Sequence, residues 1–422
     1  MFTQIAGIVL LAVMFIIATA LPINMGALAL VAAFIIGLLS HLAAKDILAG
    51  FPGDLFVTLV GITYLFAIAQ NNGTVDWLVQ KAVWLVRGRV AVMPWVMFFV
   101  AATLTAVGAV SPAAVAIIAP IALRFADKYG LSPLLMGLIV IHGAQAGGFS
   151  PISIYGGITN QIVERAGLPR NDLALFLASF FFNLFVAVLI FIYLGQHRTS
   201  RNSSADAGTQ AHAEVDKEEH QQNQLNLHRS LTLVGLIALT LGSLVFELNV
   251  GLVAISVAVL LALLAPGTQK KAIDQVSWST ILLVTGVVTY IAVLQRIGAV
   301  DLAGNSVSRI GVPLLGALLL CYIGGVVSAF ASSIAVLGAT IPLAVPFLLQ
   351  GQVHPVGVVA AIAISSTIVD VSPFSTNGAL VVASAHGVDK DSFYRQMLVY
   401  SAIVVAVGPF LTWLVLVVPR WL

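Results

Sequence analysis

Two short stretches of the chain place hydroxyl side chains beside a proline in the middle of apolar runs. Ser150-Pro151-Ile152-Ser153 occurs in the first half, and Ser372-Pro373-Phe374-Ser375 follows 222 positions later. Proline lacks an N–H donor and clashes with the preceding turn, so a helix should unwind at each stretch. In a bilayer, unwound backbone is tolerated only where it is buried in protein or lines a cavity. The freed carbonyls of such a break can bind a cation, and the half-helix that restarts beyond it can bind an anion.

The polar side chains at these two breaks are therefore the first candidates for ligand contacts. Small polar residues between two pairs of apolar arms, where each pair should turn back on itself, are the second. Together they give the predicted substrate-binding residues Ser111, Ser150, Ser153, Ser332, Ser333, Ser375, Thr376 and Asn377. The predicted Na⁺ ligands are Ser150, Asp370, Ser372 and Ser375. The residues predicted to break the helices are Gly147, Gly148, Pro151, Gly156, Gly157, Pro373 and Gly378.

Each of these features also has a purely structural interpretation. A Ser-Pro pair can be a simple kink whose hydroxyl bonds back to its own helix, but its recurrence in both halves favours a functional role. Asp370 is an ionisable group inside an apolar run, which by default has a function; binding Na⁺, carrying a proton and capping the restarting helix all stay open. His142 is the other ionisable group in mid-segment, and we interpret it as a packed, neutral histidine.

Composition defines the class of protein that must position these residues. The chain has 422 residues, of which 60% are hydrophobic and only 9% charged, far from the roughly 25% charged residues of soluble domains. Apolar runs of about 17 to 20 residues recur along it, which is the length of a transmembrane helix. We therefore predict an all-α polytopic membrane protein with no nucleic-acid partner and no cofactor other than a coupling ion. The first run, residues 4–20, is predicted to be a retained helix rather than a cleaved signal, and Cys321 to be a packing residue.

The two halves of the chain are similar to each other. Asn24 and Gly26 recur as Asn249 and Gly251, an offset of 225, and residues 67–76 recur as residues 292–301 at the same offset. Further on, Pro120 pairs with Pro342 and the two break motifs pair with each other, all at an offset of 222. Matches in the same order over several regions indicate a duplication.

Each half divides into the same series of segments. In the first half we predict spans at 4–20, 23–40 and 55–70, an amphipathic helix at 74–88, a hairpin with arms 90–107 and 113–127, an interrupted segment at 132–165 and a last span at 172–194. In the second half we predict spans at 231–247, 249–265 and 279–295, a hairpin turning near Ser332, an interrupted segment at 356–386 and a last span at 396–418. A polar stretch with no apolar periodicity, residues 196–229, is predicted to be a linker between the halves.

Charge favours hairpins that re-enter the membrane rather than cross it. With re-entrant hairpins each half crosses five times, so the halves lie upside down relative to each other, with about ten spans and two hairpins in all. The loops then divide the 19 Lys and Arg residues as 13 on one side and 6 on the other. By the positive-inside tendency, the side with 13 faces the cytoplasm. This orientation places the linker in the cytoplasm and both termini outside the cell membrane.

Inverted repeats with broken helices are the architecture of secondary transporters, whose site lies where the repeats meet near the midplane. No basic residue lies at the breaks, so an anionic substrate would be held by helix N-termini, hydroxyls, amides and a co-bound cation. Coupling to Na⁺ follows as a hypothesis. An intramembrane hydrolase is disfavoured, because Ser150 lacks a G-x-S-x-G elbow and one active site gives no reason for a second copy of the motif.

One segment of the chain resembles a known family. The run GFPGDLFVTLVGITYLFAIAQNNGTVDWLV, residues 50–79, resembles the N-terminal signature of the malonate/dicarboxylate carrier family, and the overall plan is similar to that of the divalent anion/sodium symporters of the ion transporter superfamily. The first resemblance covers about the first 160 residues and the second covers the whole chain, mostly in topology.

The resemblance implies an elevator-type homodimer that carries malonate or C4-dicarboxylates such as succinate or malate. It divides the first repeat, 1–195, into a fixed scaffold, 1–89, and a moving transport part, 90–195. The second repeat, 230–422, has its scaffold at 230–311 and its transport part at 312–422. Two alternatives stay open: the large membrane subunit of a binding-protein-dependent (TRAP-type) dicarboxylate transporter, and an ion exchanger or arsenite exporter of the same superfamily.

Overall fold

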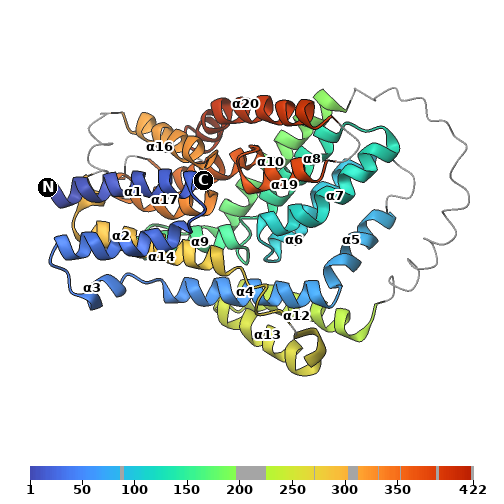
Figure 1. The fold of residues 1–422 in the computed structure, drawn as a ribbon, viewed down its shortest axis with the longest axis horizontal. Helices are drawn as coiled ribbons and strands as arrows, with labels where there is room; N and C mark the ends of the chain where they lie inside the picture. Colours follow the sequence, from blue (N-terminus) through green and yellow to red (C-terminus); the bar gives the residue numbers. More distant parts are fainter. Residues whose placement is uncertain are drawn as a thin grey trace, which may run out of the picture.

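The computed structural model describes residues 1–85, 90–195, 225–269, 271–302, 312–330, 332–351, 353–385 and 389–419, and within these ranges the chain is helical with no strand. The ten helices described before the linker are α1 (Phe2–Ala20), α2 (Met25–Leu39), α3 (Ala44–Leu48), α4 (Gly53–Asn71), α5 (Thr74–Leu85), α6 (Met93–Ala106), α7 (Ser111–Tyr129), α8 (Pro133–Gly147), α9 (Ile154–Arg165) and α10 (Asp172–Leu194). Those described after it are α12 (Leu227–Leu244), α13 (Val250–Leu264), α14 (Trp278–Arg296), α16 (Pro313–Ser328), α17 (Ser333–Leu348), α18 (Pro355–Ile368), α19 (Thr376–Ala383) and α20 (Lys390–Leu416). This all-helical architecture confirms the predicted fold class (Figure 1).

The predicted segments correspond to these helices, and α10 has the predicted bounds. Other bounds differ by a few residues, and α20 begins at Lys390 instead of 396. Asn226 caps α12, its side chain accepting from the Arg229 N–H at 2.9 Å, so α12 includes residues 227–229 of the predicted linker. The cap satisfies an otherwise unpaired donor at the helix start and fixes where the helix begins. Residues 196–224 of the linker, and residues 86–88 of the predicted amphipathic helix, lie outside the described residues.

Length and hydropathy alone qualify five helices of the described ranges as membrane spans, with α18 and α19 counted as one interrupted segment, Pro355–Ala383. Others are shorter than predicted, such as α2 and α13 with 15 residues each. Both begin at an Asn cap: Asn24 accepts from Gly26 N–H at 2.8 Å, and Asn249 accepts from Leu252 N–H at 3.0 Å. The duplicated Asn therefore sets the start of a short helix in each half.

The duplicated glycines lie where helices of the two halves cross. A Cβ built on Gly286 of α14 would lie 2.2 Å from the carbonyl oxygen of Gly26 on α2, and a Cβ on Gly61 of α4 would lie 2.6 Å from that of Gly251 on α13. Gly26 is related to Gly251, and Gly61 to Gly286, by the offset of 225. Small residues let membrane helices approach to backbone contact. The two crossings are thus one contact repeated by the internal symmetry of the chain.

The hairpins and broken helices are also paired across the halves. Each hairpin packs on the broken helix of its own repeat, α6 and α7 on α8, and α16 and α17 on α18. In addition α7 packs against α19, and α17 packs against α9. Each hairpin therefore contacts both broken helices, and the two hairpin tips meet at the breaks.

The remaining singled-out residues are buried in this assembly. His142 on α8 is fully buried, with Nδ1 3.0 Å from Asn183 Oδ1 on α10 and Nε2 2.7 Å from Tyr400 Oη on α20. It links helices of both repeats, which agrees with the packed interpretation. Cys321 is buried and forms no disulfide.

Candidate functional site

The two helix breaks have the same internal hydrogen bonds. Ser153 caps α9, accepting from the Gly156 N–H at 3.3 Å and donating to the carbonyl oxygens of Gly148 and Ser150. Ser375 caps α19 in the same way, accepting from the Gly378 N–H at 3.2 Å and donating to the carbonyl oxygens of Asp370 and Ser372. The second serine of each motif therefore holds the break in shape and occupies two of the carbonyls that unwinding frees.

The glycine three positions after each capping serine is required by a close backbone approach. A Cβ on Gly156 would lie 2.0 Å from the carbonyl oxygen of Ser150, and a Cβ on Gly378 would lie 2.0 Å from that of Ser372. Contacts this short force the backbone to move. The Ser-Pro-x-Ser motif and its following glycine thus form one structural unit, used twice.

A cavity of about 380 Å³ lies beside the second break. Three groups of residues line it: both hairpin tips, the starts of α9 and α19 with Asp370, and the start of α14. They are Val110, Pro112, Tyr155, Ser279, Thr280, Leu283, Ser332, Ser333, Ile334, Asp370, Ser375, Thr376 and Asn377. Its volume suits a ligand of a few to about a dozen heavy atoms.

Five helix N-termini line this cavity, those of α7, α9, α14, α17 and α19. Each contributes N–H groups without helical partners and a partial positive charge, which favour bound anions. No Lys, Arg or His is among the lining residues. The donors that the cavity offers to an anion are therefore backbone N–H groups and the hydroxyl and amide side chains beside them.

Asp370 is the single charged side chain that lines the cavity, and it is 6% exposed. Ser333 donates to Oδ1, and Tyr155 donates to Oδ2 at 3.4 Å. Ser328 in turn donates to Ser333 Oγ at 2.8 Å. These donors come from the second hairpin and from α9 of the first repeat, so the carboxylate links the two repeats beside these N-termini.

The amide of Asn377 makes a second connection between the repeats. Its Nδ2 donates to Ser111 Oγ at the first hairpin tip, at 2.8 Å, while Oδ1 is buried without a partner. A buried carbonyl oxygen without a partner is costly and is expected to accept from a ligand or to bind a cation. Asn377 is the duplicate of Tyr155, so the same position reaches across to the other repeat in both halves.

The structure brings most of the predicted site residues together and separates a few. Ser332, Ser333, Ser375, Thr376, Asn377 and Asp370 line the cavity, and Ser111 contacts Asn377. Ser150, Ser153 and Ser372 do not line it: Ser150 Oγ donates to the Ala106 carbonyl at 2.6 Å, and Ser372 Oγ accepts from the Phe374 N–H at 3.2 Å. Their predicted ligand roles stay predictions, but in this arrangement their hydroxyls serve the fold.

Sequence reasoning missed Tyr155 and the residues at the start of α14 as parts of the site. Tyr155 could have been found as the duplicate of the predicted site residue Asn377. Ser279, Thr280 and Leu283 carry no such signal, because they belong to a span far from either break in the sequence.

Comparisons with known proteins agree with this architecture. Residues 1–148 match the family described as dicarboxylate carrier protein MatC N-terminus, and residues 235–420 match the citrate transporter family. The crystal structure of the Alcanivorax borkumensis YdaH transporter, described as revealing an unusual topology, is similar in fold, with a TM-score of 0.58 and 14% identity over 87% of this chain and 86% of that chain. No curated protein sequence matches the chain.

The fold and the family matches define the class: the chain is a multi-pass membrane carrier and not an enzyme. More specifically, the two matches together support a secondary transporter of carboxylates, in agreement with the predicted resemblance to dicarboxylate carriers.

Proposed function

We propose that the protein is a cation-coupled symporter of small dicarboxylates, malonate or C4 acids such as succinate and malate, with Na⁺ as the coupling ion rather than H⁺. The observation that carries this proposal is a cavity lined by five helix N-termini and a single carboxylate, with no basic side chain among its lining residues. The N-termini suit the substrate carboxylates. A cation beside Asp370 offsets the charge that Asp370 and a doubly charged substrate would otherwise bring together.

The division into scaffold and transport parts is supported by a difference between the repeats. The scaffold helix α4 packs against the broken helix α9, whereas its counterpart α14 packs against the hairpin arm α17. Strict symmetry would give α4 and α14 equivalent partners. The difference is what results when one part slides along the other, so we assign the scaffold to 1–89 and 230–311 and the moving part to 90–195 and 312–422.

The same proposal covers assembly and orientation. We assign the chain to the cell membrane as a homodimer formed through the scaffold, with the linker in the cytoplasm and both termini outside. The cavity then opens toward the cytoplasm, because Ser279 and Thr280 lie at the start of α14, directly after the Lys270 and Lys271 loop.

Uptake into proteoliposomes containing only this chain tests the function. Labelled malonate, succinate, malate, citrate and tartrate are each offered with an inward Na⁺ gradient, with a proton gradient and with neither. We expect Na⁺-dependent uptake of a dicarboxylate, and Asn377→Ala to abolish it. Ser243→Ala serves as a control, because Ser243 lies on α12 and bonds only to its own helix.

The alternative outcomes separate the competing functions. Uptake that is indifferent to Na⁺ but follows the proton gradient refutes Na⁺ coupling and keeps the carrier. Uptake of none of the five acids by the chain alone, with uptake restored by a soluble binding protein and a small membrane subunit, identifies the TRAP-type alternative.

A further inference from the structure

A second, larger cavity of about 790 Å³ lies on the other side of the first break and shares no lining residue with the first. It is bounded by α4, by α9 with the loop that follows it, and by the connection between α12 and α13. Its charged lining residues are Asp54, Glu164, Arg165, Arg170, Asp172 and Glu247. In the proposed orientation it opens to the outside.

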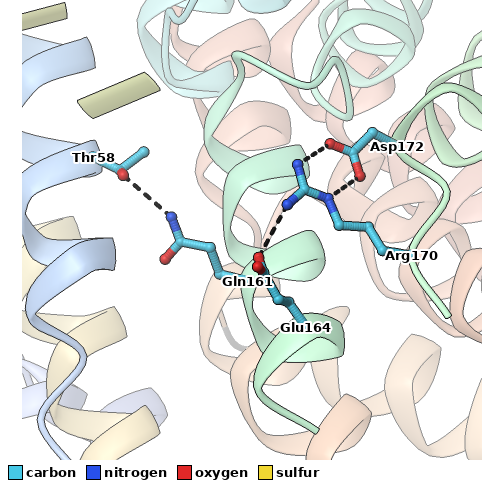
Figure 2. A network of polar contacts seen from close by, with 5 residues as sticks. All are labelled: Thr58, Gln161, Glu164, Arg170 and Asp172. Atoms are coloured by element: carbon cyan, nitrogen blue, oxygen red, sulfur yellow. Dashed lines mark hydrogen bonds and ion pairs between the residues drawn. The ribbon is translucent and has the colours of Figure 1, made fainter. Parts of the chain in front are cut away.

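Two polar contacts cross this cavity from α9 to α4. Arg165 at the end of α9 forms an ion pair with Asp54 at the start of α4. One turn earlier, Gln161 Nε2 donates to Thr58 Oγ1 at 3.2 Å (Figure 2). Between these contacts and the site, Gly157 of α9 faces Thr58, with a Cβ on Gly157 placed 3.8 Å from Thr58 Cγ2. Each contact joins the proposed moving part to the proposed scaffold.

Other ion pairs in the same cavity do not cross. Arg170 pairs with Glu164 at 3.0 Å and with Asp172 at 2.5 Å, and all three residues belong to α9, α10 and the loop between them (Figure 2). The hydrogen bonds from Arg170 to Asp172 raise the pKa of the guanidinium further above its ordinary value. These ion pairs stabilise the loop within the proposed moving part, and they serve as a control for the ion pair that crosses to α4.

The residue types at the corresponding positions of the second repeat cannot form the crossing contacts. Asp54 and Thr58 correspond to Ser279 and Leu283 at the offset of 225, and Gln161 and Arg165 correspond to Ala383 and Gly387 at the offset of 222. Neither corresponding pair can form an ion pair or a side-chain hydrogen bond. In the structure Ser279 and Leu283 line the site cavity, and α14 packs against α17 in place of α19.

We infer that Asp54–Arg165 and Thr58–Gln161 form a latch that keeps the moving part in the state whose site opens beside Ser279. The inference rests on the proposed function, because it requires a part that moves. In the opposite state α9 leaves α4 and α19 approaches α14, where no polar contact replaces the ones that were broken. The two crossing contacts of the first repeat therefore bias the carrier toward the observed state.

The expected bias is modest. The side chains of Arg165 and Asp54 are 39% and 45% exposed, and exposed ion pairs of this kind change an equilibrium by about two- to fivefold. A latch of this strength favours one state without preventing transport, and salt weakens it.

A reversible cross-link tests whether the contact must open during transport. Because a Cβ built on Gly157 would lie 3.8 Å from Thr58 Cγ2, we expect cysteines at both positions, Thr58→Cys with Gly157→Cys, to be joined by oxidation across α4 and α9. Oxidation should abolish uptake, and reduction of the same sample should restore it. The control is a pair within the scaffold, Gly242→Cys with Val253→Cys, where a Cβ built on Gly242 would lie 3.5 Å from Val253 Cγ1. Oxidation of this pair should leave uptake unchanged. Failure of the first pair to cross-link, or full uptake after cross-linking, overturns the latch.

A labelling experiment tests the bias without any substrate. Thr280→Cys lines the site cavity, and the buried Cys321 should not react with a maleimide. We expect Asp54→Asn to lower the labelling rate of this cysteine relative to wild type, by no more than the roughly two- to fivefold change in the equilibrium between the two states. The control Glu164→Gln removes a neighbouring charge that does not cross, and should not change the rate. Equal rates in Asp54→Asn and Glu164→Gln overturn the bias.

The two readouts separate a failure of the latch from a failure of the proposed function. If wild-type protein takes up none of the acids, the proposed function fails, while the labelling rates still decide the latch. If wild-type protein transports and Asp54→Asn labels like wild type, the function stands and the latch fails.

Discussion

The two helix breaks have one local structure and two chemistries. In both, a serine caps the restarting helix and binds the same two carbonyls, and a glycine lets the loop approach the helix. The first break has Gly148 where the second has Asp370, and Tyr155 where the second has Asn377. The cavity lies at the second break. Duplication thus preserved the geometry of the break, while substitutions at a few positions gave one copy the charge.

The largest effect is expected from removing that charge. Asp370→Asn keeps the size of the side chain but removes the carboxylate that Ser333 and Tyr155 contact and that we assign to the cation. Charged hydrogen bonds contribute about 1.5 to 3 kcal/mol, so uptake at low Na⁺ should fall about ten- to a hundredfold. Uptake measured over a Na⁺ series checks this, and a variant with unchanged Na⁺ dependence would remove Asp370 from the coupling site.

Alanine at the duplicated glycines tests whether the two breaks are mechanically equal. Gly156→Ala and Gly378→Ala should each cost about 1 to 3 kcal/mol, because each new methyl group meets a carbonyl oxygen. Gly157→Ala, whose nearest neighbour is 3.8 Å away, is the control and should be close to neutral. Thermal unfolding in detergent gives the comparison. A tolerant Gly156→Ala beside a destabilised Gly378→Ala contradicts the shared geometry.

The capping serines should separate stability from binding. Ser153→Ala and Ser375→Ala each remove an N-cap, at a cost of about 0.5 to 2 kcal/mol in the free energy of unfolding. Ser375 lines the cavity and Ser153 does not, so only Ser375→Ala should also raise the KM for uptake. Unfolding curves and uptake kinetics measured on both variants separate the loss of stability from the loss of binding. A raised KM in both variants would show that both breaks contact substrate.

The smallest effect is expected at the first hairpin tip. Ser111→Ala removes a neutral hydrogen bond to Asn377, which contributes about 0.5 to 1.5 kcal/mol, or about two- to tenfold in apparent substrate affinity. Ser150→Ala is the matched control in the same repeat, because its hydroxyl binds the Ala106 carbonyl outside the cavity. Substrate titration by thermal shift measures both. A larger affinity loss in Ser150→Ala reverses the assignment of the two serines.

Most of the fold could be predicted because its signals are local. The length of an apolar run, a proline and an Asn cap can each be recognised from a short stretch of sequence. The bounds of α10 and the positions of both breaks were therefore predicted closely. The start of α12 was missed, because the apolar run begins after the helix does and the cap at Asn226 lies inside a polar stretch.

The site was predicted only in part, for a reason that lies in the symmetry. Equal motifs at both breaks predicted equal sites, and Ser150 and Ser372 were assigned as ligands beside Ser375. In the structure, hydrogen bonds with the backbone engage the hydroxyls of Ser150, Ser153 and Ser372. Which hydroxyl faces a cavity depends on how the hairpins and scaffold pack around each break, and no local pattern records that.

The sequence by itself determined an all-helical membrane carrier built from two similar halves, because composition and duplication are properties of the chain. It also determined where each helix breaks, since proline and glycine act on their own backbone. Only the tertiary structure decided which break holds the cavity, that Tyr155 and Ser279 belong to it, and that α4 and α14 have different partners. Those features depend on contacts between segments that lie far apart along the chain, and packing selects among arrangements that the local sequence leaves equivalent.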